Sequence, residues 1–529
     1  MNQLGFKNFR KFADFPMLSL GDITLLVGGN NAGKSTFVKA ALLVYNFINT
    51  KVGDLSKGGI FGSLKPEMKF DVTTPFDVNI GTYAKAKKRN TNIKDSVVFS
   101  YNLKGFKIEA HVSSLLVNGE IDPDSTTGVI TFISIEDTER NVIYSVDYSL
   151  GRMYVEFGAT VSKEEINNLA AVVEKRTRLE ALLKDEKEFA KIVDIKNEIA
   201  RLNKFVHNWE GENNIKSEKL DLPLCDFSDS PSAYYLVNLI RSFVEYANVA
   251  TPTTLKKNSK EYKKDVQDKA VLKSKLRTME SSMTGLELNI VVTRIEYIYA
   301  HAARQNVFLN SKDQNDYIAQ TIHDFMSSKA NYNEDVKKFI VKWMDKKEFN
   351  IGNDFRIKVI GGEAYQVFIK NDEEECPLAD MGMGSIQLMI LLFRLGTYIN
   401  KYKAGAYPLT ILIEEPEQNL HPKLQSKLAD LFCGLNKEYH YRFIIETHSE
   451  YLIRKTQVIV AEENYEDENA LKENNPFMVY YFDGGNEEIP YYQMQYTLSG
   501  RFANKFGEGF FDEAGKSNLI TLRKEKGLK

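Results

Sequence analysis

The sequence predicts an α/β fold with a mixed, largely parallel core sheet, an antiparallel β-subdomain and a helical insertion. Short apolar runs that end in polar residues, at 23–27, 409–413 and 443–445, are typical of buried parallel strands. Alternating, β-rich stretches between about 106 and 157 predict the antiparallel part. A segment without Gly or Pro, 162–209, carries an apolar stripe at helical spacing and predicts the helices.

These changes divide the chain into three parts. Residues 1–160 would form the first part of the α/β unit with its β-subdomain, 161–285 a helical or short coiled-coil insertion, and 286–529 the rest of the α/β unit. The net charge of −3 excludes nucleic-acid binding through bulk charge. Three scattered cysteines, no signal-type N-terminus and no spanning apolar run lead us to expect a cytoplasmic protein without a membrane segment.

The first strand runs into a glycine-rich loop. Gly28, Gly33, Lys34 and Ser35 fit the pattern G-x-x-x-x-G-K-[ST], and a helix is expected from about 33 to 47. In such a loop the backbone amides surround phosphate oxygens, the lysine reaches the terminal phosphates and the serine hydroxyl offers a ligand to Mg²⁺. The predicted nucleotide-binding residues are Gly28, Asn30, Asn31, Ala32, Gly33, Lys34, Ser35 and Thr36.

The strand at 409–413 ends in two carboxylates, Glu414 and Glu415. Adjacent residues of a strand point to opposite faces, so the two acids would divide their tasks. We expect Glu414 to organise Mg²⁺ and Glu415 to orient or deprotonate an attacking water. An acidic turn after a core strand is the plainer alternative.

The strand at 443–445 is followed by Glu446, Thr447, His448 and Ser449. A histidine at such a strand end is a candidate sensor of a terminal phosphate, although a lone histidine is more often structural. Gly382, Gly384 and Ser385 open an apolar helix whose first amides suit an anion, which could belong to a neighbouring subunit. A plain loop before a core helix is the alternative for that segment.

The order of these motifs resembles ABC-type ATPase heads. The local sequences EEPEQNLHPKLQ, ETHSEYLIRK and YIYAHAARQN are similar to the OLD-like group (AAA-15/AAA-21). The resemblance implies an ATPase that binds ATP and Mg²⁺ between two heads of a homodimer or higher oligomer. It implies that Glu414 is the Walker B carboxylate, Glu415 the hydrolytic glutamate and His448 the switch histidine. It further implies that Gly382, Gly384 and Ser385 form a signature segment that acts in trans. Asn419 and His421 would lie in a loop that faces the partner head.

Three departures from the family pattern stand out. Glu414 replaces the usual aspartate, the signature reads MGMGSIQ, and no clear Q-loop glutamine occurs, although 79–83 occupies its place. The longer glutamate shifts the expected Mg²⁺ geometry but keeps its charge.

The resemblance also implies a role in bacterial anti-phage defence, with a separate nuclease as effector. That partner would be a Toprim protein in PARIS-type systems or an HNH protein in Septu-type systems. After residue 455 no Asp-x-Asp pattern follows, and histidines are scattered, so we expect no nuclease in this chain. The basic stretch 255–277 would be either a solvated helix face or a contact for DNA.

Other functions remain open at this point. An SMC-like or zinc-hook DNA-maintenance ATPase needs a longer coiled coil or a Cys-x-x-Cys hook, neither of which the sequence offers. A nucleotide-dependent scaffold with little turnover would use ATP only to hold two copies together. A membrane ABC transporter subunit would be shorter and would carry LSGGQ.

Overall fold

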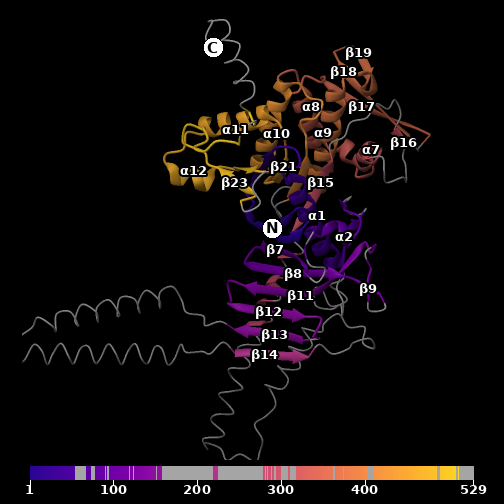
Figure 1. Cartoon of the computed structure of the whole chain (residues 1–529). Helices are drawn as coiled ribbons and strands as arrows, with labels where there is room; N and C mark the ends of the chain where they lie inside the picture. Colours follow the sequence, from indigo (N-terminus) through magenta and orange to yellow (C-terminus); the bar gives the residue numbers. More distant parts are fainter. Residues whose placement is uncertain are drawn as a thin grey trace, which may run out of the picture.

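The molecule has an upper, helix-rich lobe and a lower lobe built on a large antiparallel sheet, with the N-terminus between them (Figure 1). A computed structural model describes, with short gaps, residues 1–53, 67–157, 218–223, 278–299, 308–309 and 317–511. Among these residues no helix is long and apolar enough to cross a membrane.

The core sheet has six strands in the order β15-β20-β21-β3-β22-β23. Neighbours from β15 to β22 pair in parallel, and β23 closes the edge antiparallel to β22. The strands are β3 (Ile23–Gly28), β15 (Arg294–Tyr299), β20 (Leu409–Glu414), β21 (Arg442–Glu446), β22 (Phe477–Phe482) and β23 (Tyr491–Met494). The sheet therefore places the N-terminal β3 beside strands more than 400 residues later, and their carboxyl ends meet at one edge.

Alternate residues of the core strands serve two hydrophobic cores. Leu412 and Ile444 belong to the core shared with helix α1 (Lys34–Gly53), whereas Ile411, Ile413 and Ile445 belong to the core on the other face. That second core also contains buried residues of α7 (Tyr317–Ser327), α8 (Glu334–Met344), α9 (Met383–Lys401), α10 (Pro422–Tyr439) and α11 (Glu450–Glu462). The strands are apolar along their length because both faces are covered.

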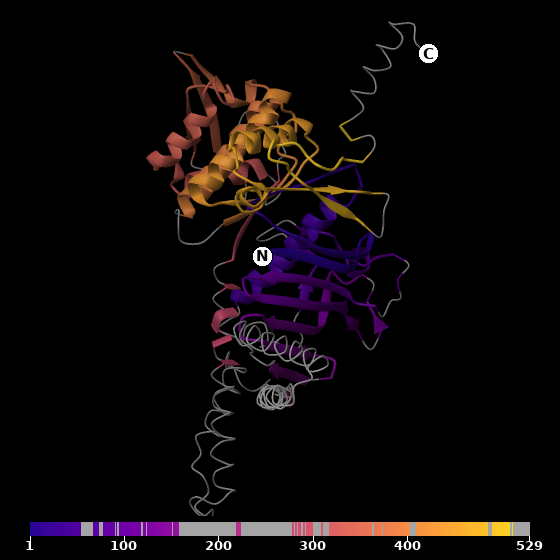
Figure 2. The same ribbon diagram turned by 90° about the vertical axis from the view of Figure 1, so that its left-hand side faces the viewer.

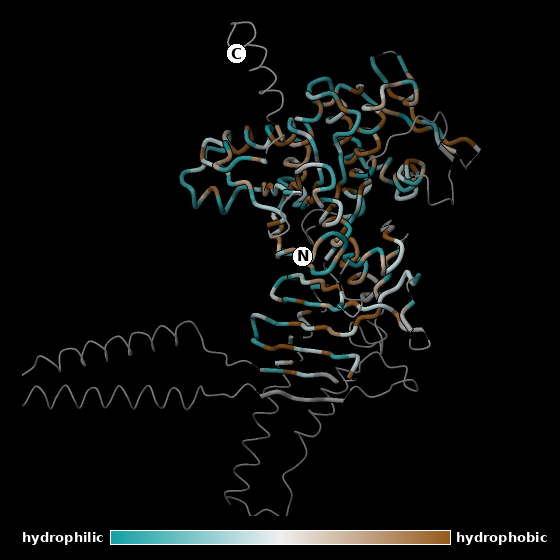
Figure 3. The backbone as a smooth tube through the Cα atoms, in the orientation of Figure 1, coloured by the Kyte–Doolittle hydropathy of each residue, from teal (hydrophilic) through white to brown (hydrophobic). Residues whose placement is uncertain are grey.

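The antiparallel sheet follows the order β14-β13-β12-β11-β8-β7-β1-β2, and the short β4 (Glu67–Lys69) also pairs with β11. Its strands mix hydrophobic and hydrophilic stretches, as expected for a sheet with one covered face (Figure 3). Their bounds are β1 (Gln3–Phe9), β2 (Phe12–Ser19), β7 (Val97–Leu103), β8 (Phe106–Ser114), β11 (Thr127–Asp137), β12 (Val142–Asp147), β13 (Arg152–Phe157) and β14 (Glu218–Pro223). Viewed from the side, this sheet lies directly below the core sheet (Figure 2).

The remaining described elements are small. They comprise β5 (Asp71–Val72), β6 (Val78–Asn79), α2 (Tyr83–Ala86), β9 (Leu116–Val117), β10 (Glu120–Ile121), β16 (Phe308–Leu309), β17 (Asp354–Ile360), β18 (Ala364–Asn371), β19 (Glu374–Pro377), α12 (Glu468–Asn474) and two short 3-10 turns. β17 and β18 form an antiparallel hairpin in which Asp354 pairs with Lys370.

The α/β fold class with its antiparallel subdomain is confirmed. The helical insertion at 161–285 and the basic stretch 255–277 fall for the most part outside the described residues. Residues 218–223, within the predicted helical insertion, instead form β14, because alternation through Leu220 and Leu222 lets this segment pair with the edge strand β13. Helix α1 runs to Gly53, beyond the expected end at 47.

Candidate active site

The glycine loop connects β3 to α1 in a conformation that its residue types permit. Gly28 and Gly33 have φ values of 144° and 115°, and Asn31 has 60°, all in the region that few L-residues enter. A Cβ on Gly33 would lie 2.3 Å from Cζ of Phe12, so no larger residue fits there. The loop therefore depends on residues that tolerate these dihedral angles, and it leads directly into the N-terminus of α1, where helix amides can bind an anion.

Lys34 is folded onto this loop. Its ammonium donates to the carbonyl oxygens of Gly28 and Gly29, each at 3.0 Å, and the residue is only 3% exposed. Burial lowers the pKa of Lys34, and the carboxylates of Glu446, Glu415 and Glu417 act in the opposite sense. From outside, Lys11 donates to the carbonyls of Asn31 (2.7 Å) and Ala32 (3.1 Å).

Ser35 meets a carboxylate that the sequence did not single out as a site residue. Its hydroxyl donates to Oε1 of Glu446 over 2.8 Å. Glu446 is 3% exposed, and its Oε2 atom has no hydrogen-bond partner among the described residues. Burial, followed by the nearby charge of Glu414, raises the pKa of Glu446 to about 7. The negative charge of a buried carboxylate with one unpartnered oxygen is poorly stabilised, and a bound cation would stabilise it.

Glu414 lies next to Glu446 across the β20–β21 pair, where the two are register partners. Its Oε1 atom accepts a hydrogen bond from the Tyr297 hydroxyl at 3.0 Å, and the residue does not line the cavity beside the glycine loop. Since β21 lies between β20 and β3, Glu446 stands on the strand next to β3 and Glu414 on the strand beyond it. The position of Glu446 at the end of an apolar strand was the sequence signal for it.

Glu415 turns away from the strand end. Its φ of 45° is left-handed, and its amide donates to the carbonyl of Glu446 at 2.8 Å. The carboxylate accepts a short hydrogen bond from Gln418, and Nε2 of His448 lies 3.6 Å from its Oε1. Backbone strain of this kind concentrates at functional sites, where the surrounding structure holds the residue in place.

His448 stands between Glu415 and Lys34. The His448 amide donates to Oε1 of Glu417 at 2.6 Å, which fixes the backbone just before α11, whose N-cap is Ser449. Burial, followed by the positive charge of Lys34, lowers the pKa of His448. The imidazole is therefore neutral at pH 7 and can both donate and accept a hydrogen bond.

Glu415, Glu446 and His448 offer ligand atoms within 4.8 Å of one another. With the Ser35 hydroxyl, the two carboxylates form the oxygen-rich set that Mg²⁺ prefers, and the unpartnered Oε2 of Glu446 fits a cation there. The imidazole is a poor ligand for Mg²⁺ and better suited to hydrogen bonding.

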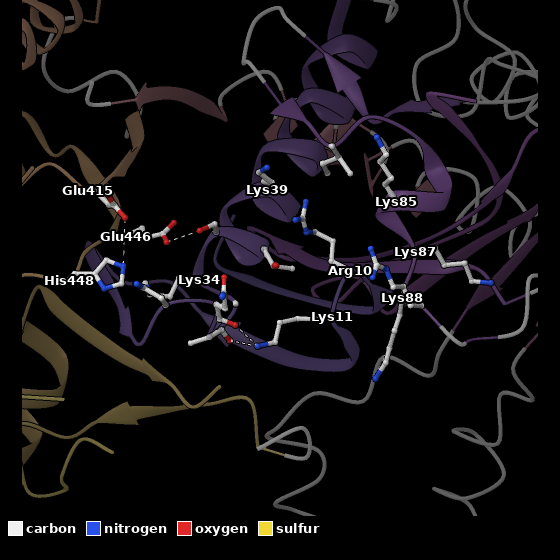
Figure 4. A pocket seen from close by; sticks show the side chains of 18 of the residues that line it. Arg10, Lys11, Lys34, Lys39, Lys85, Lys87, Lys88, Glu415, Glu446 and His448 are labelled. Carbon is white, nitrogen blue, oxygen red and sulfur yellow. Dashed lines mark hydrogen bonds and ion pairs between the residues drawn. The ribbon is translucent and has the colours of Figure 1, made fainter. Parts of the chain in front are cut away.

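These groups line a cavity of about 1100 Å³. Glu415, Glu446 and His448 stand on one side of Lys34, and basic side chains extend away on the other (Figure 4). Of the predicted site residues, those that line it are Asn30, Asn31, Ala32, Gly33, Lys34, Ser35, Thr36, Glu415 and His448. Ile80, from the segment in place of a Q-loop, also lines it, as do Arg10 and Lys11, which sequence reasoning missed.

The predicted signature segment lies elsewhere in the chain's own fold. Gly382 is the N-cap of α9, and Gly382, Gly384 and Ser385 do not line the cavity. A Cβ on Gly384 would lie 2.8 Å from the carbonyl oxygen of Asn419, so the start of α9 packs tightly on the loop after β20. Gln387 reinforces this contact by donating to the Pro416 carbonyl at 3.3 Å.

The family model described as AAA ATPase domain matches residues 1–453. The chain belongs to the AAA ATPase domain family. It is an ATPase.

No curated protein matches the chain. Among solved structures, it is similar to the Smc head domain of Pyrococcus furiosus bound to the C-terminal domain of ScpA, with 11% identity, coverage of 99% of both chains and a TM-score of 0.30. The SMC head domain of Thermotoga maritima matches at 11% identity, covering 86% of this chain and 91% of that one, with a TM-score of 0.28.

Proposed function

We propose that this AAA-family ATPase is an ABC-type head that hydrolyses ATP between two copies and thereby regulates a separate effector nuclease in bacterial anti-phage defence. One observation carries the catalytic part of the proposal. Lys34 and Ser35 from the N-terminal part line the same cavity as Glu415, Glu446 and His448 from the C-terminal part. The two halves of a phosphate-cleaving site thus come from β3, β20 and β21 of one sheet.

The glycine loop would hold the phosphates of ATP. Its inward amides and the N-terminus of α1 offer donors to anionic oxygens. Lys34, now bound to the carbonyls of Gly28 and Gly29, would exchange these contacts for the terminal phosphates. Ser35 and Glu446 would hold Mg²⁺, which when bound neutralises negative charge on the phosphate oxygens.

Glu415 is positioned to act on the attacking water. Its left-handed backbone is fixed by the hydrogen bond that the Glu415 amide donates to the Glu446 carbonyl, and Gln418 donates a hydrogen bond to one carboxylate oxygen. The other oxygen faces His448 and can accept a proton from water. Neutral His448 would hydrogen-bond the terminal phosphate and so report whether it is still attached.

The start of α9 would complete the site of a second copy. Gly382, Gly384 and Ser385 do not reach the cavity of their own chain, which is consistent with action in trans. The resemblance to OLD-like ATPases supports this dimer, as it supports the defence role and an effector of Toprim or HNH type. A scaffold with little turnover remains the alternative within the same geometry.

Turnover of Glu415→Gln against wild type tests the catalytic part. Loss of the water-activating carboxylate should lower kcat by roughly 10²–10⁴-fold while ATP binding is retained, because general-base catalysis contributes about that much. Steady-state phosphate release and fluorescent-nucleotide binding measure the two effects. Equal rates for both proteins would remove Glu415 from the role of base and favour the scaffold.

A phage challenge tests the regulatory part separately. Cells would carry the wild-type gene or a Lys34→Ala variant, each with the neighbouring open reading frames and each also alone. We expect the efficiency of plating to fall only with wild type plus neighbours. Unchanged plating in every arm, with ATP hydrolysis intact, would refute the defence role but leave the ATPase mechanism standing.

A further inference from the structure

One wall of the nucleotide cavity carries far more positive charge than a nucleotide requires. We call this wall the basic arc; it consists of Arg10, Lys11, Lys39, Lys85, Lys87, Lys88 and Arg89. It extends from Lys34 away from Glu415, Glu446 and His448 (Figure 4).

The backbone beneath the basic arc is firmly built. The amide of Arg10 donates to the carbonyl of Ala86 at 2.6 Å, and that of Lys88 donates to the carbonyl of Asn8 at 2.8 Å. A β-bridge joins Phe9 to Lys87. The β1–β2 turn and the end of α2 are thus fastened together and form one platform for the basic arc, apart from Lys39, which belongs to α1. Lys87 is only 8% exposed, so the accessible charge of this platform comes from its other basic side chains.

The turn itself is held in an unfavourable conformation. Asn8 and Arg10 have φ values of 54° and 52°; asparagine tolerates this left-handed region, but for Arg10 it costs free energy. This turn lies at the edge of the cavity, and its conformation directs the side chains of Arg10 and Lys11 toward the cavity.

The charges around the cavity do not balance for ATP alone. Among the described residues, eight basic side chains line it, the basic arc and Lys34, together with two carboxylates, Glu415 and Glu446. Asp95 acts on Lys87 and offsets one more charge. Mg²⁺-bound ATP carries only about two negative charges at neutral pH, on its triphosphate, and adenosine carries none. A ligand that matches the basic arc must therefore add further anionic groups beyond the nucleotide.

We propose that the basic arc binds the phosphate backbone of double-stranded DNA, beside the nucleotide and independently of hydrolysis. Regularly spaced phosphates are the ligand to which Lys and Arg side chains on a rigid platform are suited. Among the described residues that line the cavity there is no Phe, Tyr or Trp, so the site lacks the stacking surface that single strands use. Lys11 joins the two sites, since its ammonium holds the glycine-loop carbonyls of Asn31 and Ala32.

The test compares two double variants by fluorescence anisotropy with a labelled duplex of about 20 base pairs at several salt concentrations. Lys85→Gln/Arg89→Gln removes two exposed charges of the basic arc. Lys338→Gln/Lys342→Gln removes two exposed charges of α8 in the upper lobe and is the matched control. The arc variant should bind at least tenfold more weakly, and its log–log salt slope should fall by about 1.8, because each phosphate contact contributes about 0.9.

Three further measurements make the result decisive. A labelled single strand of the same length should bind more weakly than the duplex, and Glu415→Gln should bind the duplex as wild type does. Nucleotide affinity of the arc variant should match wild type. The proposal is overturned if wild type fails to bind duplex DNA, if the control loses as much affinity as the arc variant, or if single strand binds better. A joint loss of ATP and DNA affinity would overturn it too, because the arc would then belong to the nucleotide site.

Discussion

Ser35 and Glu446 lie 411 residues apart in the chain, yet a 2.8 Å hydrogen bond joins them. The contact depends on β3 and β21 being parallel neighbours, which brings the loop after β3 beside the end of β21. Next in the sheet, β20 contributes Glu414 and Glu415. The carboxylates of Glu414, Glu415 and Glu446 therefore lie at the same edge of the sheet as the phosphate loop, and each has different hydrogen-bond partners.

The partners of these carboxylates predict which of them serves Mg²⁺. Glu446→Gln and Glu414→Gln are matched changes, because both remove one charge at the end of a parallel strand. We expect Glu446→Gln to raise the Mg²⁺ concentration for half-maximal turnover by about tenfold or more. Glu414→Gln should raise it less, since the Glu414 carboxylate is bound by Tyr297 rather than by Ser35.

Magnesium titrations of ATP hydrolysis measure both effects, and binding of nucleotide without Mg²⁺ serves as the control for folding. A larger effect for Glu414→Gln would restore the assignment that the family resemblance implies. It would mean that Tyr297 releases Glu414 when the nucleotide binds.

At the scale of elements, sequence reasoning reached the core strands and missed what lies between them. The strands β3, β20 and β21 were predictable because both of their faces are covered, which makes them continuous apolar runs. Side-chain types at their ends then predicted the phosphate loop, Glu415 and His448. Glu446 was visible only as a strand-end residue, because nothing local in the sequence indicates which strand lies beside β3.

Other features depend on pairing between distant segments. β14 exists because β13 offers an open edge, and its two leucines alone are too weak a signal beside Pro223. Arg10 and Lys11 reach the cavity because β1 and β2 form a hairpin that places their turn over the glycine loop. A linear pattern shows such residues as ordinary surface charges.

The turn from β11 to β12 offers a stability prediction for the antiparallel sheet. Asp137 is fully buried, and its carboxylate accepts from the amides of Glu139 and Arg140, each at 3.0 Å, and from the Arg140 guanidinium at 3.1 Å. Burial alone would raise the pKa of Asp137, but Ser282 and these contacts with Arg140 bring it below its ordinary value.

Asp137→Asn should therefore lower the free energy of unfolding by about 2 kcal/mol at pH 7. Asparagine keeps Oδ1 as acceptor for the two amides, but it sets an NH2 donor in place of the Oδ2 that accepts from the Arg140 guanidinium, so this charged contact inside a buried site is lost. Since the folded pKa is lowered, the ionised carboxylate stabilises the protein above the unfolded pKa, and this contribution is lost as pH falls through the folded value. The difference between variant and wild type should accordingly shrink in acid.

Urea unfolding at several pH values measures this. Asp147→Asn is the matched control, because Asp147 caps the next turn in the same way but is half-exposed, and it should cost about 1 kcal/mol or less. An equal cost for both variants at every pH would contradict the role of burial at Asp137.

At the scale of the whole molecule, the cavity is open and the segment proposed to close it lies on a different part of the surface. The start of α9 packs on the loop after β20 through Gly384 and Gln387 and does not turn toward Lys34 of its own chain. A second copy related by two-fold symmetry would place each α9 over the other's nucleotide, giving two composite sites per dimer.

Mixing two inactive variants tests this arrangement. Lys34→Ala disables the glycine loop, and Ser385→Arg blocks the signature segment with a bulky charge, so each protein alone should hydrolyse ATP at a small fraction of the wild-type rate. In a mixed dimer one composite site has both defects, and the other combines an intact Lys34 with an intact Ser385. If subunits exchange freely, about half of the dimers are mixed and half of their sites are whole, so the mixture should recover about a quarter of wild-type turnover.

Phosphate release measured as the mixing ratio is varied should peak at equal amounts of the two proteins. A mixture no more active than its components, with subunit exchange verified by labelled copies, would mean that Ser385 acts within its own chain and that each head hydrolyses ATP alone.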